Sequence, residues 1–390
     1  MAYRRITRAL VTTMGLFTAF VTFGAGSALV AAAASPSVAY SISSGFGQTC
    51  AVTGPNSAAK CWGRNDYGEL GTGNTTSSLT PVGVSGLSSK VAAVSAGGSR
   101  SCALSTSGGL KCWGTSPGNG VSSSLIPVSV NGLASGVRSV SAGGTFTCAV
   151  TTAGEVRCWG SGTLGQLGDG LLTSSSVPVT PTGLSSGIAA VSVGAQHACA
   201  LTTAGGVRCW GWNNYGETGD PSGATSTPTP IDVAGLPSDV TAVFVGGYHS
   251  CAVTSTGGAW CWGENQVGQL GDGTTTDRAT PAPVSGISGV TSMTGGTYHT
   301  CALTTGGAAR CWGSNNSGQL GDGSMVDRWL PVPVVGLSSG VVQISGGRFH
   351  TCSVDGAGRA KCWGHNLWGQ LGDGTTTWRR TPVGVSGLSR

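Results

Sequence analysis

Hydrophobic residues along this chain occur in short runs that end at glycines, and the same runs return many times. In one copy an apolar run at 91–96 ends at Gly97 and Gly98, a second run covers 101–104, and a third covers 110–113 after a Ser/Gly turn. Such runs predict short β-strands joined by tight turns. A connection rich in Gly, Asn and Pro then leads to a further apolar stretch, where a fourth strand is expected. No segment has a helical period, so the sequence predicts an all-β protein.

The tripeptide Cys-Trp-Gly marks each copy of the repeat. Successive copies are 46 to 52 residues apart, and each has a second cysteine about ten residues upstream, which accounts for all 14 cysteines. The tripeptide begins at Cys61, Cys112, Cys158, Cys209, Cys261, Cys311 and Cys362. Seven units of about fifty residues, each with three or four strands, predict a seven-bladed β-propeller, because a β-helix has shorter repeats.

The two ends of the repeat suggest how the ring closes. The first strand-like segment, 38–42, is equivalent to 91–95 of the next copy, and the chain ends at 383–388, just before another such strand is due. We expect the N-terminal strand to complete the blade begun by the C-terminal segment, which leaves fewer free strand edges.

The first 34 residues lie outside the repeat. Three arginines precede a long apolar run that ends in four alanines, a pattern typical of a secretory signal peptide, although an uncleaved anchor remains an alternative. Residues 35–390 then form a single domain, secreted and outside the membrane once the peptide is cleaved. This domain has a net charge near +2, which argues against nucleic-acid binding.

The copy at 296–323 carries a family resemblance. It reads Gly-x-x-His-Thr-Cys-Ala-Leu-Thr, then Cys-Trp-Gly-x-Asn-x-x-Gly-Gln-Leu-Gly-Asp-Gly, and closely resembles the regulator of chromosome condensation repeat. The resemblance covers roughly residues 38–390 and implies a seven-bladed propeller. Members of the family serve as exchange factors for a nuclear GTPase, as ubiquitin-ligase modules and, in a secreted bacterial form, as an inhibitor of β-lactamase. The resemblance therefore implies protein binding but names no partner.

The paired cysteines depart from the better-known members of that family. In the predicted hairpin, residues 102 and 112 lie opposite each other, within reach of a disulfide, and secretion would permit the bond. Zinc sites and free thiols are alternatives, but no CxxC spacing occurs. The expected disulfides are Cys50–Cys61, Cys102–Cys112, Cys148–Cys158, Cys199–Cys209, Cys251–Cys261, Cys301–Cys311 and Cys352–Cys362.

Four histidines recur two residues before the first cysteine of a pair: His197, His249, His299 and His350. A ring of imidazoles could hold a metal or move protons. The strand-turn context favours buried histidines that hydrogen-bond the local backbone. No metal or cofactor is expected, because the Gly-Asp-Gly loops lack the alternating carboxylates of a calcium site.

Candidate binding residues are those that break the repeat. Six of them stand in connecting segments where other copies carry small or polar residues, or lie beside such positions: Trp212, Trp329, Trp378, Arg328, Arg379 and Arg380. Exposed Trp and Arg are typical of protein-binding hot spots, and exposed Trp also suits stacking on sugars. Scattered surface aromatics without a role are the competing interpretation. In the second copy, Thr115 to Val121 replace the Gly-Gln-Leu-Gly-Asp-Gly segment, which predicts a notch in the loop surface.

These observations favour a secreted, monomeric, non-enzymatic scaffold that binds an extracellular protein through the propeller loops. A glycan-binding propeller is the alternative, although a lectin would repeat its sugar site in every blade. An enzyme with a site at the mouth of the central channel is less favoured, because no nucleophile and base, or separate pair of carboxylates, stands apart from the repeat.

Overall fold

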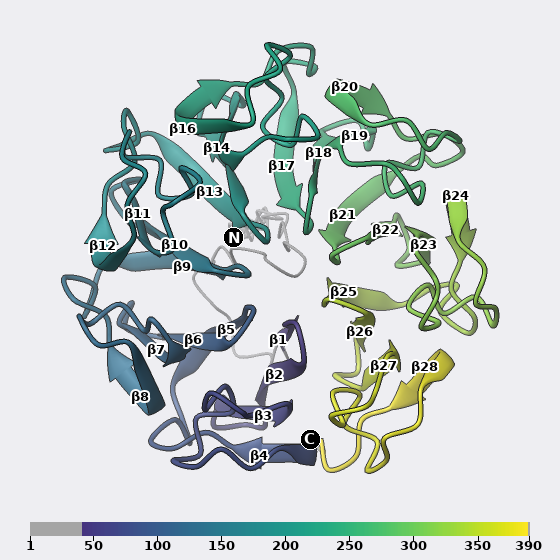
Figure 1. The fold of residues 1–390 in the computed structure, drawn as a ribbon. Coiled ribbons are helices and arrows are strands. Elements are labelled where there is room, and N and C mark those ends of the chain that lie inside the picture. Colours follow the sequence, from purple (N-terminus) through teal and green to yellow (C-terminus); the bar gives the residue numbers. More distant parts are fainter. Residues whose placement is uncertain (1–40, 389–390) are drawn as a thin grey trace, which may run out of the picture.

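The computed structural model describes residues 41–388 and contains seven four-stranded antiparallel sheets arranged as blades around a central axis (Figure 1). The predicted seven-bladed propeller is confirmed, including the fourth strand. Within these residues, no helix is long and apolar enough to cross a membrane. The predicted signal peptide, residues 1–34, lies outside the described residues.

Each blade is built from four strands that follow one another in the chain. By blade, the strands are β1 (Ser41–Ser44), β2 (Gln48–Thr53), β3 (Ala58–Gly63) and β4 (Ser78–Gly83); β5 (Val91–Ala96), β6 (Arg100–Ser105), β7 (Leu110–Thr115) and β8 (Ser123–Ser129); β9 (Val137–Ala142), β10 (Phe146–Thr151), β11 (Val156–Gly160) and β12 (Ser175–Val179); β13 (Ile188–Val193), β14 (His197–Thr202), β15 (Val207–Trp212) and β16 (Ser226–Asp232); β17 (Val240–Val245), β18 (His249–Thr254), β19 (Ala259–Gly263) and β20 (Arg278–Pro283); β21 (Val290–Gly295), β22 (His299–Thr304), β23 (Ala309–Gly313) and β24 (Arg328–Pro333); β25 (Val341–Gly346), β26 (His350–Asp355), β27 (Ala360–Gly364) and β28 (Arg379–Gly384).

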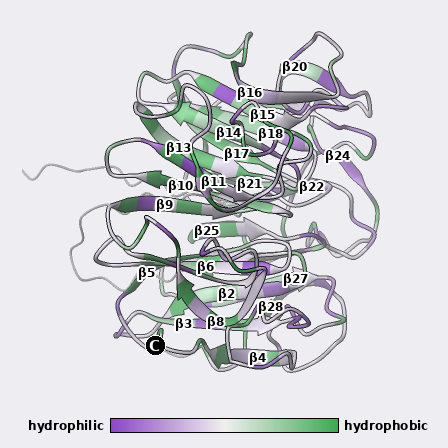
Figure 2. Ribbon diagram, turned by 60° about the vertical axis from the view of Figure 1, so that its left-hand side comes forward, coloured by the Kyte–Doolittle hydropathy of each residue, from purple (hydrophilic) through white to green (hydrophobic). Residues whose placement is uncertain are grey.

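The core lies between neighbouring blades. The second strand of each blade is buried on both faces, because each face packs against another blade, and the hydrophobic colouring in Figure 2 lies mostly on the strands. The fourth strand forms the outer edge and is largely accessible to solvent. The tryptophans of the seven Cys-Trp-Gly tripeptides are all completely buried, so they belong to the framework.

Closure of the ring differs from our expectation. β1 pairs with β2 in blade one, and β28 pairs with β27 in blade seven, so the predicted sharing of a strand between the chain ends is wrong. The first and last blades instead meet side by side (Figure 1). Gln343 exchanges two hydrogen bonds of 3.0 Å with the backbone of Ile42, and Ser345 Oγ accepts from Ser44 N at 2.8 Å. Each blade keeps its own four strands, and side-chain hydrogen bonds to the neighbouring backbone join the first and last blades.

All seven predicted disulfides are present in the described residues. Each joins the second and third strands of one blade at directly opposite positions, as the hairpin geometry predicts; Cys102 faces Cys112. In blade one the extra residue between Cys50 and Cys61 is absorbed by the turn, where Gly54 and Ser57 take positive φ angles of 73° and 55°. Closing a loop of this size stabilises a fold by about 2–3 kcal/mol in the chain-entropy model.

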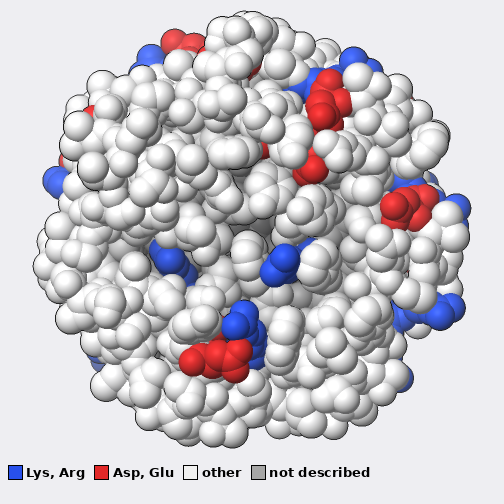
Figure 3. Space-filling view, viewed as in Figure 1, with Lys and Arg blue, Asp and Glu red and all other residues white. Residues whose placement is uncertain are grey.

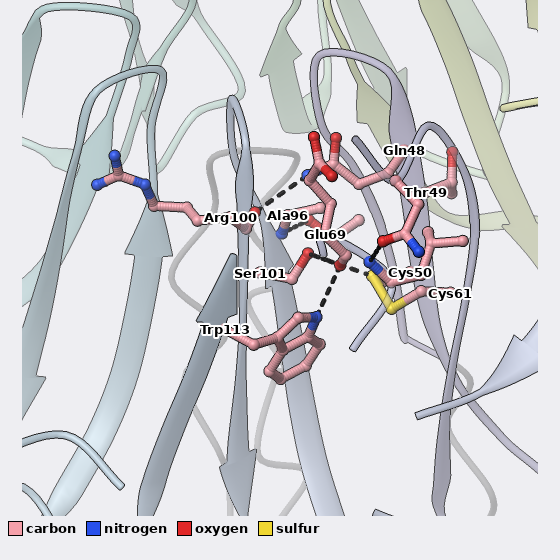
Figure 4. The surroundings of a disulfide bond; sticks show 12 residues. Gln48, Thr49, Cys50, Cys61, Glu69, Ala96, Arg100, Ser101 and Trp113 are labelled. Carbon is pink, nitrogen blue, oxygen red and sulfur yellow. Dashed lines mark hydrogen bonds between the residues drawn. A yellow bond between two sulfur atoms is a disulfide. The ribbon is translucent and has the colours of Figure 1, made fainter. Parts of the chain in front are cut away.

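At six of the seven interfaces neighbouring blades are joined by one backbone carbonyl, which we call the shared carbonyl. It belongs to the Gln or Glu of the Gly-Gln-Leu-Gly segment. At five interfaces it accepts two hydrogen bonds from the next blade, whereas the carbonyl of Gln166 accepts one, from Trp210 Nε1. Figure 4 shows the first case: Ser101 Oγ and Trp113 Nε1 both reach Glu69, at 2.9 and 2.7 Å from its carbonyl oxygen. Between blades five and six, Thr300 Oγ1 and Trp312 Nε1 reach the carbonyl of Gln269 at 2.7 and 3.0 Å.

The four recurring histidines take part in the same arrangement. Each is fully buried, as predicted, but its partner is a hydroxyl of the next blade and not the local backbone: His249 Nε2 lies 2.8 Å from Thr300 Oγ1. That hydroxyl gives its proton to the shared carbonyl, so the histidine must donate from Nε2, and its Nδ1 is left without a partner. Burial lowers the pKa of His249 to about 4 and of His299 to about 3, which keeps the rings neutral.

Removing one of these hydroxyls tests the arrangement. Thr300→Val keeps the side-chain shape but deprives His249 and the carbonyl of Gln269 of a partner, so we expect the free energy of unfolding to fall by about 1–3 kcal/mol. Urea denaturation measures the change. Thr275→Val, at an exposed loop position of blade five, is the matched control. Equal stability of the two variants would show that the hydroxyl does not join the blades.

Candidate functional site

The positions that vary between blades gather at one end of the strands. Because neighbouring strands are antiparallel, the turn between the first two strands and the long loop between the third and fourth emerge at the same end. In five blades one asparagine holds the long loop: Asn265 Oδ1 accepts from Leu270 N at 3.0 Å, and Asn265 Nδ2 donates to the carbonyl of Thr276 at 3.1 Å. The same bonds recur around Asn315 and Asn366. This framework fixes the variable side chains in place.

An unbroken series of rings, which we call the aromatic arc, crosses this end of blades four to seven. Tyr248, Tyr298 and Phe349 are the last residues of three successive turns, and their ring centroids are 5.7 and 6.5 Å apart. His365 continues the series, 6.2 Å from Phe349 and 4.9 Å from Trp378. The full arc is Tyr215, Tyr248, Tyr298, Phe349, His365, Trp368 and Trp378.

A groove crosses the arc over blade six. Ser314 and Ser317 stand in its loop where blade seven carries the larger His365 and Trp368. These small residues leave a cavity of about 610 Å³, within the range of ligand-binding pockets. Its walls include Glu264 and Val267 of blade five, Tyr298 of blade six, and Phe349, His365 and Trp378 of blade seven.

Blades two and three lack these large side chains. The turns of blades two and three end in Ser99 and Thr145, at the positions of Tyr248 and Tyr298, and the position of Glu264 is held by Thr115 and Ser161. The arc therefore covers one side of the channel mouth only. A partner that contacts this face is bound by particular blades and not by the repeat as such.

The groove combines weakly charged and aromatic groups. Glu264 is 7% exposed; burial, and secondly the charge of Asp277, raise its pKa to about 7, while Gln269 Nε2 donates to Glu264 Oε2 at 3.1 Å. Burial, with Arg348 as a second cause, lowers the pKa of His365 below its usual value. The face in Figure 3 is largely uncharged, with acidic and basic side chains in small separate groups. Such a surface suits contacts made mainly by aromatic rings.

The predicted tryptophans do not form one cluster. Trp378 lies in the groove, and 41% of its surface is exposed. Trp212 is the last residue of β15, at the position that Glu264 and His365 occupy in blades five and seven, so it belongs to the same set of variable positions. Trp329 is 52% exposed on β24 and packs against Gly268 of blade five. Their part in binding stays a prediction.

Two of the predicted arginines have partners inside their own loops. Arg328 Nε lies 2.9 Å from Asp322 Oδ2, and Arg379 Nη2 lies 2.8 Å from Asp373 Oδ2. Arg278 pairs with the equivalent aspartate of blade five, so this ion pair is framework in three blades. Arg380 stands at the position of Trp329, on β28. Among the described residues, no three His, Cys, Asp or Glu side chains are grouped as metal ligands.

Sequence reasoning missed most of the arc. Tyr248, Tyr298 and Phe349 directly precede the recurring histidines, at a position that holds Gly47 and Thr145 in other copies. This variation indicates that the position is not part of the framework, because a framework position would keep one residue type. The predicted residues were tryptophans and arginines, so the tyrosines and the phenylalanine of the turns were not among them.

Two of the four glutamates lie beneath the face, in the place of the Gln of Gly-Gln-Leu-Gly. Glu217 Oε2 accepts from Tyr215 N at 2.9 Å, as the glutamines do, but its Oε1 has no hydrogen-bond partner. Burial raises the pKa of Glu217 to about 8, so at neutral pH it is mostly protonated and resembles glutamine. This is a structural role, not that of a catalytic acid.

The fold defines a seven-bladed propeller whose loop face is asymmetric. The chain matches the RCC1-like domain over residues 117–390, and the regulator of chromosome condensation (RCC1) repeat over residues 61–104 and 91–120. This protein therefore belongs to the RCC1-like family.

Three known proteins show how far the similarity extends. The ultraviolet-B receptor UVR8 of Arabidopsis thaliana is 32% identical over 348 residues, which are 88% of this chain and 57% of the receptor. The E3 ubiquitin-protein ligase HERC2 of Homo sapiens is 31% identical over 62% of this chain, but only 5% of the ligase is covered. The crystal structure of Prp20p from Saccharomyces cerevisiae matches with a TM-score of 0.74 at 21% identity, over 84% of this chain and 85% of that one, which supports the fold alone.

The raised pKa of Glu217 predicts a pH-dependent stability. A buried acid with a folded pKa near 8 and an unfolded pKa near 4.5 stabilises the fold fully below pH 4.5 and loses that effect as the pH rises to 8. Glu217→Gln should therefore raise the free energy of unfolding by about 1–3 kcal/mol at pH 8 and change it little at pH 4.5. Urea denaturation at both pH values measures this, with Glu155→Gln, in a partly exposed turn, as the control. A gain of the same size at both pH values would contradict the assignment.

Proposed function

We propose that this protein is a secreted, non-enzymatic scaffold that binds an extracellular protein through the aromatic arc and its groove. The observation that carries the proposal is the unbroken series of rings from Tyr215 to Trp378, most of them partly exposed, held on rigid loops at one side of the channel mouth. Aromatic side chains that are fixed before binding contribute much contact area at low entropic cost, which is why they dominate protein-binding hot spots.

A protein partner suits this face better than a repeated small ligand. The arc spans four blades and includes a groove over blade six, whereas blades two and three present small residues. A glycan site repeated by the propeller would recur in every blade. Among similar proteins, the description of Prp20p concerns its binding to Gsp1p and histones, so a protein partner has a precedent on this fold.

Secretion is supported by the sequence and by the disulfides together. The apolar segment after Arg8 has the pattern of a signal peptide, and seven disulfides suit an oxidising compartment. We infer that residues 35–390 act as one monomeric domain.

The side chains of the face favour binding over catalysis. Glu264 bonds to Gln269, and Glu217 lies beneath the loop surface as a substitute for glutamine. His365 Nδ1 lies 2.7 Å from Gln370 Nε2, a framework contact at the groove wall. None of these groups faces a nucleophile in a geometry for proton transfer.

Paired variants test the binding face. Proteins from secreted and cell-surface fractions are captured on the oxidised protein, and the dissociation constant of the captured partner is measured for Tyr298→Ala/Trp378→Ala. We expect its affinity to fall at least tenfold, because two groove side chains are removed. Arg359→Ala is the control: it lies in blade seven at the opposite end of the strands, in the turn between β26 and β27.

A glycan array on the same sample separates the alternative. Sugar binding that is lost in the double variant would favour the lectin. A protein partner that binds Tyr298→Ala/Trp378→Ala as tightly as it binds the control Arg359→Ala would contradict the proposed face.

A further inference from the structure

One of the seven interfaces between blades lacks the shared carbonyl. Six interfaces have it, from Glu69, Gln166, Glu217, Gln269, Gln319 and Gln370. In blade two the loop between β7 and β8 has seven residues, where the other blades have 13 or 14, and the Gly-Gln-Leu-Gly segment is missing. The notch expected from the sequence therefore removes an acceptor at the interface of blades two and three.

The donors that would use this acceptor are still present. Trp159 Nε1 and Thr147 Oγ1 of blade three occupy the positions of Trp312 and Thr300, are fully buried, and have no hydrogen-bond partner among the described residues. Thr147 and Trp159 are directly opposite each other in β10 and β11, so their polar atoms share one site. At the other six interfaces the tryptophan NH of the incoming blade is satisfied.

A buried positive charge lies at the same interface, next to Gly160. Arg100 stands in blade two at the position of the recurring histidines, and only 4% of it is exposed. Its Nη2 bonds weakly to Thr115 Oγ1 at 3.4 Å, whereas its Nε and Nη1 have no partner. Nη1 approaches Gly160, the residue after Trp159, closely enough that a Cβ there would lie 2.9 Å away. In Figure 4 the Arg100 guanidinium points away from Gln48 and the disulfide of blade one.

The guanidinium of Arg100 and the indole NH of Trp159 can only donate, and Thr147 Oγ1 has no described partner. No described carboxylate forms an ion pair with Arg100, and burial lowers the pKa of Arg100 to about 10, the direction expected for a cation without a counter-charge. A buried, unpaired guanidinium is strongly unfavourable. A water molecule could accept from one or two donors, but it would leave the charge uncompensated.

We propose that a small inorganic anion of halide size, chloride in ordinary salt, binds at the interface of blades two and three. Its ligands are the guanidinium of Arg100, the hydroxyl of Thr147 and the indole NH of Trp159. The anion replaces the missing carbonyl oxygen as the acceptor and balances the buried charge. It is an internal site that joins two blades, independent of the proposed binding face.

The next interface, where the carbonyl of Gln166 accepts from Trp210 Nε1, has no charge and no hydroxyl at the equivalent positions. There the histidine position holds Phe146 and the hydroxyl position holds Ala198, both buried in one apolar cluster. The double variant Arg100→Phe/Thr147→Ala copies this pair and removes the charge together with the hydroxyl. The double variant leaves only Trp159 Nε1 of the three proposed ligands, so it serves as the control that should not bind an anion.

Urea unfolding at constant sodium concentration tests the site, with gluconate replaced stepwise by chloride. For one site that is occupied only in the folded state, each tenfold increase of chloride above its dissociation constant multiplies the folding equilibrium constant by about ten. The double variant should show no such dependence. A native protein that is insensitive to chloride, or a double variant with the same sensitivity, would overturn the proposal.

Crystals of the unaltered protein grown in sodium bromide give a second, independent measurement. Anomalous scattering should place one bromide in contact with Arg100 Nη1, Thr147 Oγ1 and Trp159 Nε1. Density for water alone, or none, at these atoms in fully occupied, well-ordered blades would contradict anion binding even if the double variant failed to fold.

Discussion

A backbone carbonyl that accepts two hydrogen bonds from the neighbouring blade is the contact on which this propeller depends. At the interface of blades five and six it holds a loop of one blade to a buried indole and a hydroxyl of the next. The disulfides act in another direction, because each joins two strands within a blade. Together the two contacts give each part of the recurring Cys-Trp-Gly a role: the cysteine forms the disulfide within the blade, and in six of the seven copies the tryptophan fixes the loop of the neighbouring blade.

A loop that is held from beneath can change its exposed residues without losing its shape. Asn265 and its equivalents satisfy the loop backbone, so the residues beside them differ freely from blade to blade. On one side of the channel mouth the variable residues are the rings of the aromatic arc. The groove lies where Ser314 and Ser317 of blade six stand in place of the larger residues of blade seven. We propose that these variable residues determine specificity for a partner, while the framework that carries them is nearly the same in most blades.

The sequence predicted the repeated contacts well, because each is marked several times. The seven disulfides follow from the opposed positions of the cysteines, and the burial of the histidines from their place on the second strand. The prediction of ring closure was wrong because a strand pattern does not reveal which neighbour a strand pairs with. In the structure, Gln343 and Ser345 bond to the backbone of blade one and join the two ends without sharing a strand. The arc and the buried donors around Arg100 were missed because each depends on residues from two or more blades that no local pattern brings together.

The central claim is that partner recognition takes place at the loop end of blades four to seven. Hydrogen–deuterium exchange of the oxidised protein, alone and with its captured partner, tests it most directly. Strongest protection is expected at the turns 246–248 and 296–298 and at the loop 365–378, and little change at the opposite turns 305–308 and 356–359. Protection concentrated at the opposite turns, with exchange at the arc unchanged, would contradict the claim.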